Sequence, residues 1–339
     1  MKDYFLIFIF SFLLFISCQN KKQAVEEEEP QLVDVTFCED SAMTFCAMQC
    51  DFGPRTMNST AHDECEKWIV SKFQEYGCEV ITQKADLKGW DGTTLHSTNI
   101  IARTNPEQAE RIIICAHWDS RPWADNDPDE DNHHTPVMAA NDGASGVAVM
   151  LELARVLNSQ LTTDSLSPST SDLRPKYGID FVCFDAEDYG TPTWSGKQDE
   201  DSWALGAQHF AKNLRPSTSD LRPKCGILLD MVGGQGARFY QEGLSKHYAQ
   251  DLVNNVWQAA NEAGYGSYFV NQSGGYITDD HKPLNEAGIP TIDIIPYYPD
   301  CEASAFGPTW HTVNDDMNHL DKNTLKAVGQ TLVQFLYTR

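Results

Sequence analysis

Four short, continuous runs of apolar residues constrain the fold of this chain more than any other feature. None shows the alternation of apolar and polar residues that is typical of a half-exposed strand. Continuous runs of this length indicate strands buried on both faces, as in a parallel sheet covered by helices. The runs are RIIICA (111–116), GIDFVCF (178–184), GILLDM (226–231) and PTIDII (290–295).

Helical patterns lie between and after these runs. Residues 146–157 place Val147, Met150, Ala154 and Leu157 on one face, and residues 247–263 and 323–337 are similar amphipathic segments. Because strands alternate with helices, the sequence predicts an α/β fold, a three-layer sandwich with a mostly parallel central sheet.

The first residues are typical of an export signal. Lys2 is followed by residues 4–16, which are apolar apart from Ser11. That run is too short to cross about 30 Å of hydrocarbon as a helix, but it fits a secretory signal. Its end, Ser17-Cys18, resembles a bacterial lipobox, where the signal is removed and the cysteine is lipidated. We therefore expect residues 1–17 to be a lipoprotein signal peptide. An ordinary signal peptide with an incidental cysteine is the alternative.

Lipid on Cys18 would anchor the exported protein to a bacterial membrane, at the periplasmic face of either membrane or at the cell surface. Residues 18–36 are acidic and poor in apolar side chains, with four glutamates in a row at 26–29, so they are predicted to form a flexible tether. Residues 37–339 are enough for a single catalytic α/β domain. The formal net charge of −24 argues against nucleic acid as a partner.

Cysteine usage allows disulfides, because exported proteins meet an oxidising environment. Cys115 and Cys183 lie inside apolar runs and are expected to be small buried side chains. The cysteines that cluster early in the chain are the expected bridge-formers: Cys38, Cys46, Cys50, Cys65 and Cys78.

Polar residues follow the ends of the predicted strands. In open α/β sheets, ligands bind in the crevice beyond the carboxyl ends of the strands, so these side chains are expected to share a site. Two loops contribute further candidates. The strand-end residues are His117, Asp119, Glu187, Asp188 and Asp230, and the loop residues are Asp142 and His311.

A divalent cation would relieve the repulsion among these carboxylates, and a mixture of imidazole nitrogen and carboxylate oxygen suits zinc. Any one of these residues alone is more often a helix cap or an ordinary histidine, but their gathering favours a metal site. Glu187 and Asp188 are adjacent, so their side chains point in different directions. One can hold the metal while the other serves as general acid and base.

Four motifs together resemble the clan of zinc aminopeptidases with two metal ions: HWDS (117–120), NDGASG (141–146), FDAED (184–188) and WHT (310–312). The animal-type glutaminyl cyclases share that fold with a single zinc. Three further stretches resemble the cyclases, including bacterial lipoprotein forms: QDEDSWALGAQHFAKN (198–213), LLDMVGG (228–234) and GGYITDDHKP (274–283).

This resemblance implies a zinc-dependent glutaminyl-peptide cyclotransferase with one zinc ion. Its substrates would be peptides and exported proteins with N-terminal glutamine, which it would convert to pyroglutamate with release of ammonia. Carried over position by position, the resemblance implies that Asp142, Asp188 and His311 are the zinc ligands. Glu187 is then the implied general acid and base.

The same resemblance assigns four further residues. Asp230 and Asp279 match acidic residues that relay protons and hold the substrate amine, and Trp194 and Trp310 match walls of the pocket. Trp194 matches only with a one-residue shift. The animal cyclases also differ from this chain at two positions, because they have a glutamate where Asp188 stands and a histidine where Asp293 stands.

Two other functions remain open on the sequence. A two-zinc aminopeptidase would need five ligands, and all five positions carry usable residues: His117, Asp142, Asp188, Asp230 and His311. The other is a catalytically dead binding ectodomain, which would be expected to have lost Glu187 or a ligand.

Overall fold

The structure, a computed structural model, describes residues 32–163, 175–214 and 223–339. The predicted signal peptide, the predicted lipidation site Cys18 and most of the predicted tether lie outside the described residues. Within them, no helix combines the length and the hydropathy that crossing a membrane requires.

A six-stranded sheet forms the centre, with strand order β1-β2-β4-β3-β5-β8. Strand β2 runs antiparallel to both of its neighbours, and the remaining pairs are parallel. The four predicted strands are therefore neighbours, and the prediction of a mostly parallel sheet is confirmed. The strands are β1 (Glu79–Lys88), β2 (Thr94–Thr104), β3 (Arg111–His117), β4 (Gly178–Phe184), β5 (Pro223–Leu229) and β8 (Thr291–Ile294).

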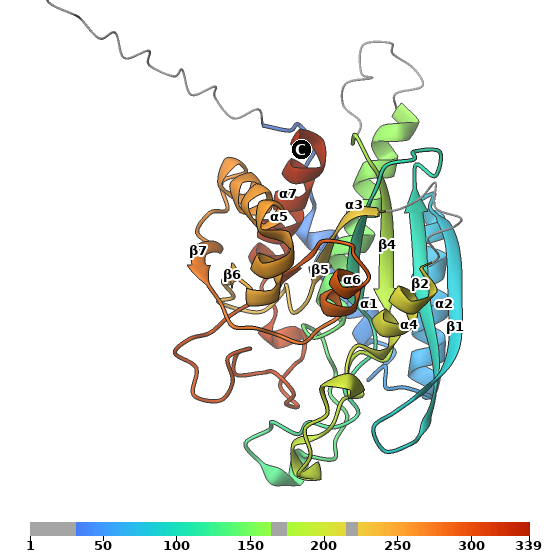
Figure 1. Ribbon diagram of the computed structural model, residues 1–339, viewed down its shortest axis with the longest axis vertical. Helices are drawn as coiled ribbons and strands as arrows, with labels where there is room; N and C mark the ends of the chain where they lie inside the picture. The colour runs from blue at the N-terminus through green and yellow to red at the C-terminus, as the bar shows by residue number, and fades with distance from the viewer. Residues whose placement is uncertain (1–31, 164–174, 215–222) are drawn as a thin grey trace, which may run out of the picture. The chain divides into compact units, whose positions relative to one another are not determined.

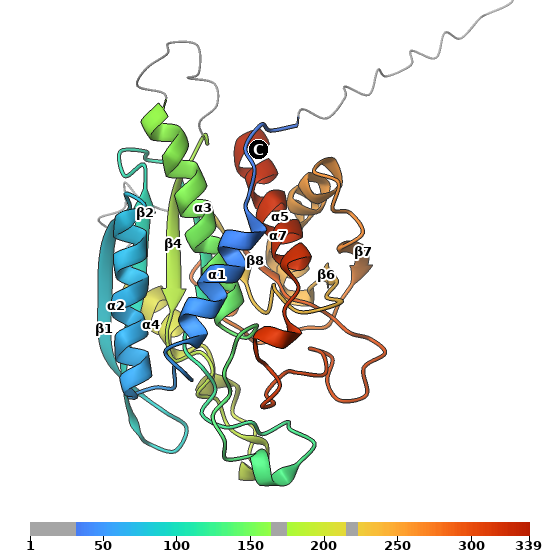
Figure 2. The same cartoon turned by 180° about the vertical axis from the view of Figure 1, so that it is seen from behind.

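Helices cover both faces of this sheet, which gives the predicted three layers. Helices α4 and α6 lie on the face toward the viewer in Figure 1, and α1, α2, α3 and α7 lie on the opposite face in Figure 2. The predicted helical segments correspond to α3, α5 and α7. The helices are α1 (Glu39–Cys50), α2 (Thr60–Glu75), α3 (Ala144–Thr163), α4 (Leu205–Asn213), α5 (Gly243–Glu262), α6 (His281–Glu286) and α7 (Lys322–Thr338).

Two smaller features complete the described fold. Strands β6 (Phe239–Gln241) and β7 (Phe269–Ser273) form a separate parallel pair. Short 3-10 helices lie at Glu130–Asn132, Thr193–Ser195, Glu200–Ser202 and Met317–His319.

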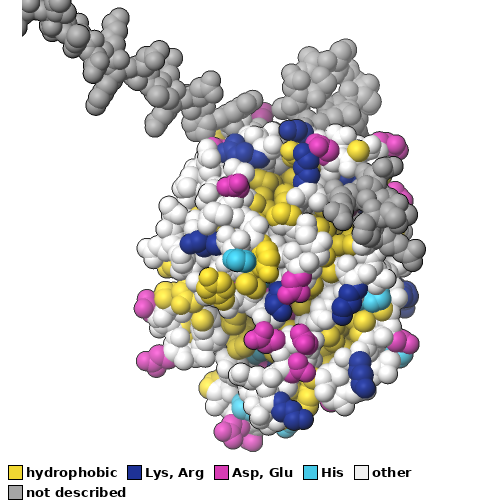
Figure 3. Space-filling view, viewed as in Figure 1, with side chains coloured by type: hydrophobic (Ala, Val, Ile, Leu, Met, Phe, Trp, Pro, Cys, Tyr) yellow, Lys and Arg dark blue, Asp and Glu magenta, His cyan; other side chains and the backbone are white. Residues whose placement is uncertain are grey.

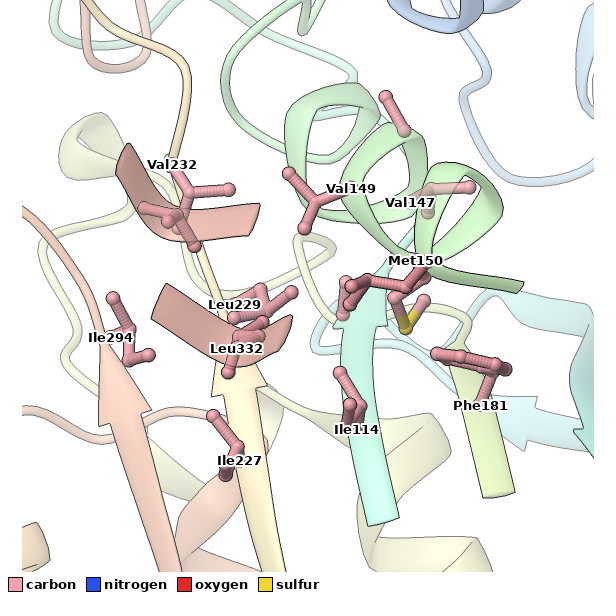
Figure 4. Packing of buried hydrophobic residues seen from close by; sticks show 14 of the residues in the cluster. Ile114, Val147, Val149, Met150, Phe181, Ile227, Leu229, Val232, Ile294 and Leu332 are labelled. Atoms are coloured by element: carbon pink, nitrogen blue, oxygen red, sulfur yellow. The ribbon is translucent and has the colours of Figure 1, made fainter. Parts of the chain in front are cut away.

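The core lies on both sides of the central strands, because successive residues of a strand point to opposite faces. Ile114 and Ile227 belong to the larger cluster, where side chains of α3 and α7 lie over the sheet (Figure 4). Ile113 and Leu228 point to the other face and pack with Leu284 of α6. Full burial of each such side chain stabilises the fold by about 1.5–3 kcal/mol. The continuous apolar runs thus reflect burial on both faces.

The end of the predicted tether needs correction, because its last residues are held against α7. The side-chain oxygen of Gln330 accepts a hydrogen bond from Phe37 N at 2.9 Å, and its Nε2 donates to Val35 O at 2.9 Å. Val35 and Phe37 are both buried. The packed domain therefore begins before residue 37.

The expected disulfides are also absent from the described residues, where all nine cysteines are free thiols. Cys46 and Cys65 are fully buried in the larger core cluster, and burial raises the pKa of the Cys65 thiol to about 12. These cysteines act as small apolar side chains, as was expected only for Cys115 and Cys183.

Candidate active site

Three loops bring the predicted zinc ligands together beyond the ends of the strands. Asp142 precedes α3, Asp188 follows β4, and His311 lies in the segment between β8 and α7. His311 Nε2 lies 3.2 Å from Asp188 Oδ1 and 3.6 Å from Asp142 Oδ2. All three side chains are buried, and one ligand atom from each lies within 4.8 Å of the others. The geometry thus places these residues as one possible metal triad.

Two buried carboxylates fix the loops that carry the acidic ligands. Asp119 accepts hydrogen bonds from the backbone N–H groups of Glu187 and Asp188, each at 3.1 Å. Asp315 does the same for Asn141 N at 2.8 Å and Asp142 N at 3.0 Å. Buried backbone donors need such partners, so each loop has one favoured conformation. The acidic side chains are therefore presented from rigid backbone.

His311 is oriented by a neighbouring carboxylate. Its Nδ1 lies 3.4 Å from Asp125 Oδ1, which leaves Nε2 directed toward the two acidic ligands. Arg121 donates to both oxygens of Asp125, at 2.6 and 2.7 Å. Although burial opposes it, the Arg121 guanidinium holds the pKa of Asp125 below its usual range. A carboxylate behind a histidine is the usual support of a metal-ligating imidazole.

The residues of this triad fit zinc. Two carboxylate oxygens and one imidazole nitrogen form a donor set that zinc sites commonly use, with a fourth position open for substrate. Asp188 Oδ2 is buried and has no hydrogen-bond partner among the described residues. Burial raises the pKa of Asp188, so its ionised form needs a compensating positive charge. Arg121 Nη1 lies 3.2 Å from Asp188 Oδ1, and a divalent cation held by the triad would compensate the charge at the unpaired Oδ2.

A second group of possible ligands shares Asp142 with the first. His117 Nε2 lies 3.0 Å from Asp142 Oδ1 and 3.3 Å from Asp230 Oδ1. One ligand atom from each of these residues also lies within 4.8 Å of the others. The structure therefore brings together donors for either one ion or two.

Glu187 stands beside the triad and belongs to neither ligand group. The preceding Ala186 has a positive φ of 53°, which turns the chain sharply at the end of β4. Glu187 lines the same pocket as Asp230 and Asp279. Burial raises the pKa of Glu187 well above its usual value and that of Asp230 to about 7. Carboxyl groups of raised pKa can both accept and donate protons near neutral pH.

The pocket has a volume of about 250 Å³, below the roughly 300–1,000 Å³ of most ligand sites. It therefore suits one small group, such as a single amino-acid side chain. Exposed acidic side chains are spread over this face, and several lie close together below its centre (Figure 3). The aromatic walls of the pocket are Trp203, Tyr276, Phe306 and Trp310.

Of the predicted site residues, the structure leaves only Trp194 outside this constellation. Trp194 is 41% exposed, and its ring packs on His134 at 4.6 Å and on Trp123 at 5.8 Å. Trp203 lines the pocket instead, with its ring parallel to that of His311 at 6.0 Å. Both tryptophans belong to the segment between β4 and α4. The one-residue shift needed to match Trp194, and the place of Trp203 inside the cyclase-like stretch 198–213, were the sequence signals that could have indicated Trp203.

The chain matches the model of peptidase family M28 over residues 99–336. It is 30% identical over 281 residues to aminopeptidase YwaD of Bacillus subtilis, and the matched region covers 79% of this chain and 50% of that protein. It is 28% identical over 258 residues to the glutaminyl-peptide cyclotransferase of Bos taurus, which covers 70% of this chain and 65% of that protein. The chain thus spans about half to two thirds of the length of these relatives.

Among solved structures, the chain resembles the Bacteroides thetaiotaomicron glutaminyl cyclase bound to N-acetylhistamine. The two share 47% identity with a TM-score of 0.83, over 90% of this chain and 100% of the solved one.

Proposed function

The chain belongs to peptidase family M28, and from this premise we propose that it is a zinc-dependent glutaminyl-peptide cyclotransferase. This enzyme would convert the N-terminal glutamine of peptides and exported proteins into pyroglutamate and ammonia. The observation that carries the proposal is the 47% identity along the whole of a solved glutaminyl cyclase. The glutaminyl cyclases of Tannerella forsythia and Porphyromonas gingivalis are also similar, at 43% and 42% identity. The likeness to aminopeptidase YwaD is weaker, at 30% identity along half of that protein, but a solved leucine aminopeptidase precursor of Bacteroides thetaiotaomicron also shares 47% identity, so an aminopeptidase is the second candidate.

Cyclisation forms a bond between the α-nitrogen and the γ-amide carbon of the same glutamine, and it breaks the bond from that carbon to the amide nitrogen. Glu187 would accept a proton from the attacking amine and deliver it to the leaving nitrogen, which departs as ammonia. Asp230 and Asp279 line the same pocket and would hold the amine. The pocket favours the folded side chain in which the reacting atoms are close.

The metal would be held by Asp142, Asp188 and His311. When bound, zinc supplies a Lewis acid that polarises the γ-carbonyl oxygen. Trp203 and Trp310 flank His311 and would exclude water from this oxygen. The side chains of the protein would therefore orient one glutamine, exclude water from it and transfer one proton.

The proposal is tested by incubating the purified, zinc-loaded protein with matched Gln-peptides and Leu-peptides. A cyclotransferase releases ammonia from Gln-peptides and leaves Leu-peptides intact. A two-zinc aminopeptidase, which the group of His117, Asp142 and Asp230 would permit, instead releases free leucine or glutamine. Free amino acid without pyroglutamate would overturn the proposed function, and turnover of neither substrate would favour a binding protein.

The two tryptophans of the segment between β4 and α4 give a matched pair of variants. Trp203→Ala removes a pocket wall, so kcat/KM for Gln-peptides should fall by about 10–100-fold, since a large buried aromatic contact contributes on the order of 1.5–3 kcal/mol. Trp194→Ala lies outside the pocket and should change kcat/KM less than about threefold, as is usual for a surface substitution. A larger loss of kcat/KM in Trp194→Ala than in Trp203→Ala would instead assign Trp194 to the pocket wall.

Export and lipid anchoring remain part of the proposal, supported by the run at residues 4–16 and by Ser17-Cys18. Cys18→Ala removes the sulfur that would carry the lipid. We expect this variant to appear in the soluble fraction, or to stay unprocessed, when expressed in a bacterium that processes lipoproteins. Membrane partition and processing like those of the unaltered protein would contradict the anchor.

A further inference from the structure

A second cluster of buried acidic residues lies on the far side of Asp279. Asp279 and Asp280 immediately precede α6, His281 is the first residue of α6, and Asp293 lies in β8. Asp280, His281 and Asp293 are fully buried, and Asp279 is 4% exposed. The proposed cyclisation uses only Asp279 of these four, so the cluster needs a separate explanation.

Several polar atoms in this cluster have no hydrogen-bond partner among the described residues. They are His281 Nδ1, Asp279 Oδ2 and both side-chain oxygens of Asp280 and of Asp293. Buried polar atoms are nearly always paired, so an unpaired group of this size indicates a missing partner. Because almost all of the unpaired atoms are carboxylate oxygens, that partner must be a donor or a cation.

His281 is turned so that its free nitrogen points into the cluster. Its Nε2 lies 3.2 Å from Glu242 Oε2. Glu242 also accepts hydrogen bonds from the backbone N–H groups of Leu244 at 2.8 Å and Ser245 at 2.6 Å. Although burial opposes it, contact with His281 lowers the pKa of Glu242 to about 2, so this carboxylate is ionised and Nε2 is its donor. Nδ1 faces Asp293 Oδ2 at a distance of 4.0 Å.

This arrangement has the geometry of a metal-ligating histidine. A carboxylate that holds one ring nitrogen while the other faces oxygen ligands is the usual support of such an imidazole. One ligand atom each from Asp279, His281 and Asp293 lies within 4.8 Å of the others. Two nitrogen or oxygen ligands of a tetrahedral zinc ion stand about 3.4 Å apart, so side-chain movements of about 1 Å would complete the site.

The shortage of basic side chains around these buried acids also favours a bound cation. Among the described residues, His281 is the sole basic side chain within 4.0 Å of Asp293, and no lysine or arginine forms an ion pair with Asp279 or Asp280. Uncompensated buried carboxylates are costly, and a divalent cation is the compact way to neutralise them.

We propose that Asp279, His281 and Asp293 bind a divalent transition-metal cation such as zinc, at a site separate from the triad of Asp142, Asp188 and His311. The mixture of imidazole nitrogen and carboxylate oxygen favours zinc over calcium or magnesium. The cation would keep Asp279 ionised and fixed at the edge of the pocket. It would thereby position a residue of the proposed reaction without touching the substrate.

The test is a zinc count per chain on purified, zinc-equilibrated protein and its variants. His281→Gln and Asp293→Asn should each lower the count by one ion, and both should leave the ion held by His311. His117→Gln is the matched control, because it removes a histidine from the other possible second site and should leave this ion in place. An unchanged count in both His281→Gln and Asp293→Asn would overturn the proposal.

Thermal unfolding provides a second test, because the change in Tm caused by Asp293→Asn has opposite signs for a bound cation and for a proton shared between Asp279 and Asp293. If the cation is bound, Asp293→Asn loses a ligand and its Tm in zinc falls below that of the unaltered protein. If Asp279 and Asp293 instead share a proton, the amide preserves a hydrogen bond and removes a buried charge, so Tm stays constant or rises and the proposal fails. Should the variants not fold, anomalous diffraction from zinc-soaked crystals of the unaltered protein decides between the two. Cyclisation of Gln-peptides by the same samples reports on the proposed function independently.

Discussion

Glu187→Gln should lower kcat for cyclisation by about 10²–10⁴-fold while the zinc content and the fold stay unchanged. General acid–base groups typically contribute this much, and the amide cannot accept the proton of the amine. The side chain belongs to neither ligand group. Its backbone N–H is held by Asp119 at 3.1 Å, a contact that the substitution leaves in place. Steady-state kinetics with a Gln-peptide and a zinc count on the same sample measure both effects.

Asp188→Asn is the matched control on the adjacent residue. An amide oxygen is a poorer zinc ligand than a carboxylate, so this variant should lose zinc affinity as well as turnover. Near-normal cyclisation by Glu187→Gln would exclude Glu187 as the acid and base, and Asp230 would become the better candidate. Loss of zinc from Glu187→Gln would instead require the two roles in the pair to be exchanged.

The central strands and the acidic ligands were predictable because both follow from local sequence. A strand buried on both faces must be continuously apolar, and residues directly after such strands meet at one edge of the sheet. Strand β1 was missed for the same reason. Its residues are exposed or half-buried at the sheet edge, so Glu79–Lys88 carries charged side chains and no continuous apolar run.

The residues that support the site depend on contacts between distant segments, which one sequence does not disclose. Asp315 reaches back 174 residues to Asn141 N. Asp125 would not contact the metal itself, because it acts through His311, whose Nδ1 it faces. Phe37 and Val35 pack in the core because α7, near the other end of the chain, offers Gln330 as a partner. Their local composition is that of a loop or a tether.

His311→Ala should remove one zinc ion per chain and abolish measurable cyclisation. His311 is the one nitrogen donor of the predicted triad, and alanine leaves Asp142 and Asp188 facing each other without it. Loss of an outer partner of a ligand typically costs about 10–100-fold in metal affinity or activity. Loss of the ligand itself should cost more, and Asp125→Asn provides the comparison because Asp125 contacts His311 Nδ1. Zinc titration and Gln-peptide kinetics on both variants give the order of effects.

The fold should survive this substitution better than the activity does. Trp310 and Trp203 flank the His311 ring and can partly close the space it leaves. Added zinc should therefore raise Tm of the unaltered protein more than that of His311→Ala, because an ion that binds only the folded state stabilises it by RT ln(1 + L/Kd), where L is the free ion concentration, and this amount grows as Kd falls. If His311→Ala keeps the full zinc content and Tm response of the unaltered protein, His311 is not a ligand. The metal would then lie in one of the other two groups, formed by His117, Asp142 and Asp230 or by Asp279, His281 and Asp293. Zinc in the first of these groups would favour the two-zinc aminopeptidase over the cyclotransferase.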